Sequence, residues 1–339
     1  MALTTPTFAL VTADVVADVL DGELAAAKEL VRDVYREAAR GGLANPPSLF
    51  LRPDPGRPSR FIALPAALEE PCRAVGVKWI GSFPANLDAG LPRASAVIVL
   101  NDPDSGFPAA CLEGAVISAT RTALSAVVAA EQLVDGRQLR RFAVVGAGVI
   151  ARRTVAILLA DGWRLGAVGV FDPRPEQAAR LGAALTAAGV EWSAADSPEE
   201  AVDDADVVLI ATTATTPWFD HPALTRPGVT VLHLSLRDVT PEAMAVCDHV
   251  VDDPAHAARE GTSLELAVRA GLARRAIRPI GALLSGAAVR DPGRATIYSP
   301  FGLGSLDVAL ADLVLRRARD RDLVVEVPDF FGAAPEGYI

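Results

Sequence analysis

The spacing of apolar and polar residues predicts a mixed α/β domain in the first third of the chain. Between residues 14 and 40, apolar positions recur at helical spacing up to a Gly-Gly pair, which predicts one helix with a glycine stop. The proline-rich stretch 45–60 predicts a loop, and the β-type runs RFIALPA, VGVKWIGSF and ASAVIVLND follow it. The segment DPDSG at 102–106 has the residues of a tight turn. The sheet of this region is predicted to be largely antiparallel, and an alanine-rich helix is expected from about Cys111 to Leu133.

The pattern changes near residue 140 to alternating strands and helices. RRFAVVGAGVIARRTVAILLADG predicts a strand, a glycine turn and a helix, and AVGVFD, ADVVLIATTA and VTVLHLSL are further apolar strands. Strands that are apolar throughout are typical of a parallel sheet with helices on both faces. SPFGLGSLDVALADLVLRRARDRD adds a glycine-rich turn that enters a helix, and the tail VVEVPDFFGAAPEGYI can pack on either part of the chain.

Composition and charge narrow the possible partners. A length of 339 residues favours two domains, and a net charge of −10 argues against nucleic acid, because phosphate binding needs a basic face. The sequence contains no run of 18 apolar residues and no basic segment of the signal-peptide kind at its start. The three cysteines have neither CxxC nor Cys/His spacing, so we expect no disulfide framework and no metal site. These features predict a cytoplasmic protein that does not interact with membranes.

A glycine turn follows the strand FAVV and opens a helix, which is the context of a dinucleotide-binding site. In G-x-G-x-x-A, Gly146 permits the tight turn, Gly148 lets a pyrophosphate approach the backbone, and Ala151 allows close packing of helix on strand. The helix start at Val149 and Ile150 offers unpaired N–H groups to the phosphates. The alternative is a strand–helix turn that merely needed glycines, and it is less favoured because strand, turn, helix and a following acid are all in place.

That acid is Asp172, at the end of the second strand, where a carboxylate binds the adenosine ribose and favours NAD over NADP. Arg174 weakens this preference, since an arginine there can bind a 2′-phosphate. The loop ATTATTP follows the strand VVLI, so Thr212 and Thr213 are expected to contact the cofactor. A hydroxyl-rich turn that caps nearby backbone is an equally good explanation for either threonine alone.

Five segments together resemble the ornithine cyclodeaminase/mu-crystallin family over nearly the whole chain. They are VKW at 77–79, ISATRT at 117–122, GAGVIA at 146–151, LSLRD at 234–238 and SPFGLGSLD at 299–307. The resemblance implies a Rossmann domain that binds NAD(P), here 123–304. It also implies a mixed α/β substrate-binding and dimerisation domain formed by both chain ends, here 1–122 with 305–339. A homodimer and an amino-acid-like substrate are the expected partners.

Within the family, the stretch VKWIGSFPANLDAGLPRASAVIVLND is similar to the dehydrogenases of 2,3-diaminopropionate biosynthesis, in siderophore and peptide-antibiotic pathways. This likeness implies NAD-dependent oxidation of N-[(2S)-2-amino-2-carboxyethyl]-L-glutamate to L-2,3-diaminopropionate, 2-oxoglutarate and NADH. Two alternatives stay open. One is another family enzyme, a cyclodeaminase or an imine reductase of the alanine or ketimine type. The other is a non-catalytic dinucleotide-dependent binding protein, which the presence of the catalytic residue types disfavours.

Lysine and arginine together number 32, and only two of them are lysines: Lys28, on an expected surface helix, and Lys78, in the apolar run AVGVKWI. Oxidation of a secondary amine by hydride loss needs the nitrogen neutral, so a nearby group must exchange protons. An arginine stays protonated, whereas burial lowers the pKa of a lysine toward neutrality. We therefore expect Lys78 to be catalytic. The alternatives are simple pairing with a substrate carboxylate, or a side chain that packs on the sheet and extends its ammonium to water.

Arg121 lies in an apolar helix, where a buried cation needs a partner. A substrate carboxylate suits its forked guanidinium, and an internal pair with Glu113 is the alternative. Because the implied substrate has three carboxylates, Arg52, Arg60 and Arg93 are further candidates for substrate binding.

The family pattern places an acid–base carboxylate at Asp238, after the strand VTVLHLSL. A helix cap or a pair with Arg237 is the alternative, and Ser235 is expected near the nicotinamide. His233 is expected to pack in the core, because it lies inside a strand. The resemblance implies that the turn with Gly302 closes over the nicotinamide, and a hinge between domains is equally compatible.

Overall fold

The computed structural model describes residues 7–332 and divides into two compact units. Unit 1 comprises Met1–Arg121 with Leu303–Ile339, and unit 2 comprises Thr122–Gly302. Helix α3, Ala115–Leu133, crosses the first boundary. The folding of each unit as an independent domain stays a prediction. None of the described helices is both long and apolar enough to cross a membrane.

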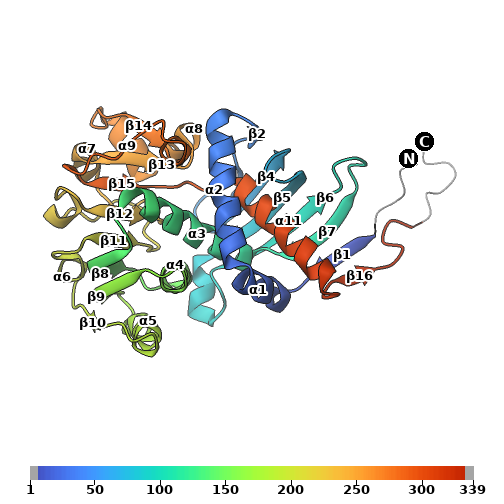
Figure 1. Cartoon of the computed structure of the whole chain (residues 1–339), viewed down its shortest axis with the longest axis horizontal. Coiled ribbons are helices and arrows are strands. Elements are labelled where there is room, and N and C mark those ends of the chain that lie inside the picture. The colour runs from blue at the N-terminus through green and yellow to red at the C-terminus, as the bar shows by residue number, and fades with distance from the viewer. Residues whose placement is uncertain (1–6, 333–339) are drawn as a thin grey trace. The chain divides into compact units, whose positions relative to one another are not determined.

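Unit 1 is a mixed, largely antiparallel sheet with helices on one face (Figure 1). Its strand order is β16-β1-β7-β6-β5-β4-β2, with β3 beside β4, and only the β1–β7 pair is parallel. The strands are β1 Phe8–Val11, β2 Leu43–Ala44, β3 Leu49–Leu51, β4 Arg60–Leu68, β5 Ala74–Ser82, β6 Ala94–Asn101, β7 Pro108–Glu113 and β16 Val325–Val327. The helices are α1 Ala13–Gly22, α2 Leu24–Arg40, the 3-10 helix η1 Pro84–Ala89 and α11 Gly304–Asp320.

Helix α11 packs on the middle strands of this sheet, and α2 packs on α11. Positions 304–311 and 313–315 of α11 are buried, which explains why this part of the helix is apolar around most of its circumference. The covered face of the sheet receives Leu64, Lys78 and Ile98, which are register partners on β4, β5 and β6. A lysine therefore lies among the core residues of unit 1.

Unit 2 is an eight-stranded sheet whose strand pairs are all parallel. Its order is β10-β9-β8-β11-β12-β15-β13-β14, so the chain progresses in opposite directions from β8, and a switch point lies between β8 and β11. Ligands bind at such points, beyond the carboxyl ends of the strands. The strands are β8 Gln138–Val145, β9 Arg164–Phe171, β10 Trp192–Ala194, β11 Val207–Ile210, β12 Thr230–His233, β13 Asp248–Val251, β14 Ile277–Pro279 and β15 Thr296–Tyr298.

The helices of unit 2 complete a Rossmann fold and confirm the predicted alternation of strands and helices (Figure 1). They are α4 Val149–Ala160, α5 Pro175–Ala187, α6 Pro198–Val202, η2 Pro222–Leu224, α7 Pro241–Val246, α8 Pro254–Ala257, α9 Ser263–Arg269 and α10 Ile280–Leu284. The four-residue strands β11, β12 and β13 are buried along their whole length. This explains why β11 (VVLI) is apolar throughout rather than alternating, while β12 and β13 also bury Thr230, His233, Asp248 and His249.

Three of the predicted elements were wrong in detail. The helix expected over 14–40 is two helices that break after Gly22, a residue with low helix propensity, although Gly41 ends the second with φ 77° as expected. The stretch 45–60 is not all loop, because β3 pairs with β4. The helix expected from Cys111 begins at Ala115, since Cys111 belongs to β7 and pairs with Val99 of β6.

Two further positions are decided by packing. Lys28, expected on the surface, is only 9% exposed, because it shares the buried face of α2 with Val31 and Tyr35 at helical spacing. The tail, which could have packed on either part of the chain, forms β16 and pairs with β1 in unit 1. Its last segment, 333–339, lies outside the described residues.

Candidate active site

Unit 1 holds a buried group of charged side chains around Lys78. The Nζ atom of Lys78 lies 2.6 Å from Oδ2 of Asp307 and donates a 3.0 Å hydrogen bond to Oγ of Ser118. Lys78 is 1% exposed and Asp307 is fully buried. The alternative of an ammonium that extends to water was therefore wrong. A fully buried lysine costs folding free energy unless its charge is paired or its amine is neutral, and here the carboxylate of Asp307 is its charged partner.

The environment of Lys78 favours its neutral form more than water does. Burial lowers its pKa from 10.5 to about 8, although the carboxylate of Asp307 opposes this effect. The nearby guanidinium of Arg121 lowers the pKa further. The amine can therefore give up and accept a proton near neutral pH, as expected for a group that serves as acid and base.

Arg121 belongs to the same group. Its Nε lies 3.3 Å from Oδ1 of Asp307, and its side chain keeps 13% of its surface exposed. The alternative partner Glu113 is occupied elsewhere, because it accepts hydrogen bonds from the backbone N–H groups of Ala115 and Val116 at the start of α3. The internal partner of Arg121 is thus Asp307 rather than Glu113. Binding of a substrate carboxylate by Arg121 stays a prediction.

The other candidate arginines lie apart from Lys78. The guanidinium carbons of Arg52 and Arg60 lie 5.1 and 6.0 Å from the centre of the Phe50 ring. Leu64 of β4 is the register partner of Lys78, and Arg60 lies four residues before Leu64. The backbone of Arg60 is therefore roughly 13 Å along the strand from the level of Lys78. Arg93 precedes β6 and is half-buried. Arg60 is on the same face of β4 as Leu64, and the roles of the three arginines stay predictions.

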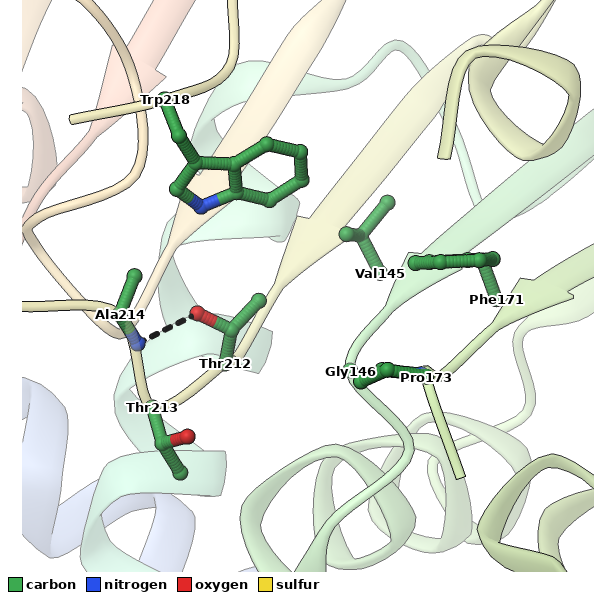
Figure 2. Close-up of a pocket in the computed structure, with 8 residues that line it drawn as sticks. All are labelled: Val145, Gly146, Phe171, Pro173, Thr212, Thr213, Ala214 and Trp218. Carbon is green, nitrogen blue, oxygen red and sulfur yellow. Dashed lines mark hydrogen bonds between the residues drawn. The ribbon is translucent and has the colours of Figure 1, made fainter. Parts of the chain in front are cut away.

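The glycine turn of unit 2 opens onto a cavity of about 290 Å³ at the switch point between β8 and β11. Figure 2 shows its lining: Val145, Gly146, Phe171, Pro173, Thr212, Thr213, Ala214 and Trp218. The two expected threonines thus reach the cavity, and the hydroxyl of Thr212 also accepts a hydrogen bond from the N–H of Ala214.

The two glycines of the turn have different constraints. Gly146 adopts φ 88°, and a Cβ there would lie 2.6 Å from the carbonyl oxygen of Ala211. Gly148 has ordinary angles, and a Cβ there would meet no described atom within 4 Å. Within the described chain, no side chain caps the N-terminus of α4, which begins with Val149 and Ile150. An uncapped helix start beside open space fits the phosphates of a dinucleotide.

Asp172 has its expected place after β9, and its carboxylate orders the turn. Oδ2 accepts a 2.8 Å hydrogen bond from the N–H of Ala147, and Oδ1 accepts one of 2.9 Å from the N–H of Arg174. The Nε of Arg174 lies 3.8 Å from the same Oδ1. The acid and the arginine are therefore neighbours beside the glycine turn, and ribose binding by Asp172 stays a prediction.

Asp238 is fully buried and receives several hydrogen bonds, two of them from residues that line the cavity. The hydroxyl groups of Thr212 and Ser235 donate to its carboxylate, and the indole N–H of Trp218 lies 3.4 Å from Oδ1. Burial raises the pKa of Asp238, but its hydrogen bonds with His233, Ser235 and Thr212 outweigh this effect and hold the pKa below its usual range. The hydroxyl oxygen of Ser235 also lies 3.3 Å from the carbonyl oxygen of Ile210.

Both structural alternatives for Asp238 were wrong. Arg237 donates to the carbonyl of Glu260 instead of pairing with Asp238, and Thr240 caps the following helix α7. His233 is buried as expected, but it does more than fill the core. Its Nε2 lies 3.1 Å from Oδ2 of Asp238, and its Nδ1 lies 3.3 Å from Oγ of Ser299.

The turn before α11 is organised by Asp252, a residue that the sequence did not single out. Its carboxylate accepts hydrogen bonds from the N–H groups of Phe301 and Gly302, and Gly302 adopts φ 102°. Closure of this turn over a nicotinamide, and a hinge function, both stay predictions.

Asp307, Ser118 and Trp218 were also missed. Asp307 stood within a quoted motif but carried no separate signal, because its partner Lys78 is 229 residues away. Ser118 precedes Arg121 by nearly one helical turn, so the 3.6-residue period could have placed both on one face. Trp218 follows a threonine-rich loop, and no local pattern marks its contact with Asp238.

The fold of unit 2, its glycine turn and its cavity define a dinucleotide-binding protein. The model of the ornithine cyclodeaminase/mu-crystallin family matches residues 10–322, and the chain belongs to this family. An N-((2S)-2-amino-2-carboxyethyl)-L-glutamate dehydrogenase of Staphylococcus aureus is 27% identical over 296 residues, which cover 84% of this chain and 88% of that protein. The alanine dehydrogenase of Archaeoglobus fulgidus is 26% identical over 319 residues, 90% of this chain and 94% of that one.

A solved structure supports the same architecture. The Δ1-pyrroline-2-carboxylate reductase of Thermococcus litoralis, in complex with NADH and L-proline, superposes with a TM-score of 0.85 at 23% sequence identity. The match covers 94% of this chain and all of that one. This likeness shows a shared fold.

Proposed function

We propose that this protein oxidises and hydrolyses N-[(2S)-2-amino-2-carboxyethyl]-L-glutamate with NAD, which yields L-2,3-diaminopropionate, 2-oxoglutarate and NADH. The observation that carries the proposal is the buried amine of Lys78 beside the guanidinium of Arg121. One group exchanges protons and the other is suited to a carboxylate, which together match the amine and the acid of an amino acid. The Staphylococcus aureus relative, named for this substrate and similar over most of the chain, supports the choice of substrate.

The reaction makes specific demands on the site. The glutamate α-carbon loses a hydride and the nitrogen loses a proton, which leaves an imine. Water then adds to that carbon, the C–N bond breaks, and the nitrogen leaves with the diaminopropionate part. Bound NAD⁺ would supply the hydride acceptor. In the proposal, Lys78 takes the proton from the substrate amine and later returns it to the departing nitrogen, while Arg121 holds a carboxylate in place.

The cofactor assignment follows from how the turn of unit 2 fits a dinucleotide. In the proposal, the open space at Gly148 and the uncapped start of α4 receive the phosphates, Gly146 permits the tight turn, and Asp172 binds the ribose. Asp238 anchors Thr212 and Trp218, which line the cavity. We propose that Asp238 holds the side chains at the nicotinamide end of the site in position. It would contact the substrate only if the substrate replaced Thr212 or Trp218 as a hydrogen-bond donor.

The test mixes purified protein with NAD and the synthetic substrate and follows NADH absorbance, with ornithine in a parallel reaction. NADH together with equimolar 2-oxoglutarate and diaminopropionate would support the proposal. Proline and ammonia from ornithine, without turnover of the first substrate, would replace it with a cyclodeaminase activity. Reduction of a keto acid in the presence of an amine and NADH alone would favour an imine reductase instead.

The activity is expected to rise with pH. Burial lowers the pKa of Lys78 to about 8, so the neutral amine that accepts a proton is scarce at pH 6 and dominant above pH 9. We expect kcat/KM to increase through an inflection near 8, because this parameter reports ionisations of the free enzyme. The measurement is kcat/KM from pH 6 to 9.5, with the substrate amine titrated separately. A flat profile over this range would contradict the role of Lys78.

We further propose that the protein is a homodimer whose interface is the uncovered face of the sheet in unit 1. Leu49, Trp79 and Val97 lie on this face through register pairs across β3 to β6, and their exposed fractions are 60%, 37% and 40%. Leu10 adds to the same face with 39%. A contiguous exposed apolar surface of this kind is typical of a protein–protein interface. The archaeal alanine dehydrogenase with a similar fold is described as a dimer, which fits this proposal.

Val97→Asp is expected to convert a dimer of twice 35.3 kDa into a monomer, because a charge would be buried in an apolar interface. Val289→Asp is the matched control, since Val289 is 81% exposed in unit 2. Light scattering after size exclusion would measure both masses. A monomeric wild type, or a Val97→Asp variant that stays dimeric, would rule out this interface.

A further inference from the structure

One carboxylate in unit 1 serves two cations that come from different elements. Asp307 lies in the first turn of α11, Lys78 in the middle of β5 and Arg121 in α3. Each oxygen of Asp307 has its own partner, since Oδ2 pairs with Nζ of Lys78 and Oδ1 with Nε of Arg121. The carboxylate has no exposed surface, so its position fixes both cations relative to each other.

The charges of this group do not balance when Lys78 is protonated. Two cations and one anion then leave a net charge of +1, whereas a neutral Lys78 leaves zero. Among the described residues, the charged groups that act on Lys78 are Asp307 and Arg121. Ser118 adds a neutral hydroxyl, and the register partners Leu64 and Ile98 are apolar. A buried excess of one positive charge is costly, so an anion that binds Arg121 would relieve it.

We propose that Asp307 is a positioning residue that couples proton uptake by Lys78 to the binding of a carboxylate at Arg121. The inference rests on the proposed function, in which these two residues handle the substrate amine and a substrate carboxylate. Without a ligand, the group makes the ammonium form of Lys78 less stable than it is in water, so a larger share of the amine is neutral and can accept a proton. A carboxylate at Arg121 adds a negative charge and favours the ammonium form. The substrate arrives as a secondary ammonium ion, so its carboxylate would promote transfer of its own proton from nitrogen to Nζ of Lys78.

This transfer is balanced and leaves the substrate in the form that the oxidation needs. The substrate N–H bond breaks, an N–H bond forms at Lys78, and the electron pair stays on the substrate nitrogen. Hydride loss from the adjacent carbon requires that electron pair. Coupling also gives selectivity, because an amine without a suitably placed carboxylate would not raise the proton affinity of Lys78.

The two lysines of this chain allow a direct test that needs no turnover. Protein labelled with ¹³Cε-lysine gives signals from Lys28 and Lys78 alone, and Lys28→Arg assigns them. The chemical shift of Lys78 is followed from pH 6 to 10 with and without glutarate, a dicarboxylate that has no amine to oxidise. In the wild type, we expect glutarate to raise the midpoint by about one pH unit or more, as a nearby opposite charge does.

The two variants are expected to shift the titration midpoint of Lys78 in opposite directions. Asp307→Asn keeps the shape and removes the charge, so we expect the midpoint without glutarate to fall by about one pH unit or more. Arg121→Gln removes a like charge, so its midpoint is expected to rise and its response to glutarate to disappear. The Arg121 variant keeps the test decisive if Asp307→Asn does not fold. An unchanged midpoint in both variants, or a glutarate response that persists in Arg121→Gln, would overturn the inference.

The outcome is separable from that of the proposed function. Expected shifts together with no oxidation of the proposed substrate would retain the coupling and reject the substrate. Turnover of that substrate without the expected shifts would retain the substrate and reject the coupling. For an active enzyme, Asp307→Asn is further expected to move the inflection of the kcat/KM profile to lower pH, which a merely structural loss of activity would not do.

Discussion

Lys78→Arg is expected to lower kcat/KM by about 10²–10⁴-fold, the range that one general acid–base group contributes. The guanidinium keeps the positive charge but stays protonated at any pH that the protein tolerates, so it cannot take a proton from the substrate amine. Lys78 is also almost fully buried, so the larger head group has little room. The measurement is steady-state turnover of the proposed substrate, beside NAD binding followed by quenching of tryptophan fluorescence.

Two further variants separate chemistry from folding. Lys78→Met fills a similar volume without a charge and leaves Asp307 paired with Arg121. We expect this variant to fold and to lose as much turnover as Lys78→Arg does. Lys28→Arg is the matched control, because Lys28 is the other lysine and lies in α2, which supplies none of the three charged residues Lys78, Arg121 and Asp307. Turnover of Lys78→Met within about tenfold of the wild type would exclude an acid–base role, since the expected loss is larger.

The two glycines of the dinucleotide turn are expected to fail in different ways. Gly146→Ala places a Cβ 2.6 Å from the carbonyl oxygen of Ala211 and forces alanine into φ 88°. The strain and the overlap together are expected to cost about 2–5 kcal/mol of the free energy of unfolding. Gly148→Val meets no described atom within 4 Å at its Cβ and keeps an ordinary φ of −69°, so its stability is expected to stay near that of the wild type.

For Gly148→Val the loss is expected in cofactor binding, because the side chain enters the space assigned to the phosphates. A weakening of about 1–2 kcal/mol corresponds to roughly 5- to 30-fold in Kd for NAD. Thermal unfolding and fluorescence titration of both variants would measure the two effects. Equal losses of stability in the two variants, or unchanged NAD affinity in Gly148→Val, would contradict the assigned path of the dinucleotide.

Much of unit 2 was predictable because its determinants are local. A buried parallel strand is mostly apolar, as β11 is throughout. A turn that bends sharply between strand and helix needs a glycine such as Gly146 with positive φ. Asp172 was predictable by its distance from that turn. The two threonines were candidates because the loop after β11 lies next to the switch point, and both line the cavity.

Boundaries within unit 1 were harder to predict, since secondary-structure propensity competes with pairing there. The run through Cys111 is rich in small apolar residues that suit a helix as well as a strand. Cys111 pairs with Val99 of β6, so this run forms a strand. Lys28 likewise shows a polar residue on a buried helix face, which the period of the helix alone does not forbid, because α11 packs against that helix.

By itself, the sequence determined the parallel dinucleotide-binding sheet, its glycine turn and the unusual choice of lysine at position 78, because each depends on residues within a few positions of one another. Only the tertiary structure decided the partners. Asp307 is separated along the sequence from Lys78 by 229 positions and from Arg121 by 186, and it contacts both. His233, expected only to fill the core, is a hydrogen-bond partner of Asp238. Hydrogen bonds and ion pairs act over about 3 Å in space, whereas sequence patterns report only neighbours along the chain, so these contacts appear only once the sheets and helices are packed.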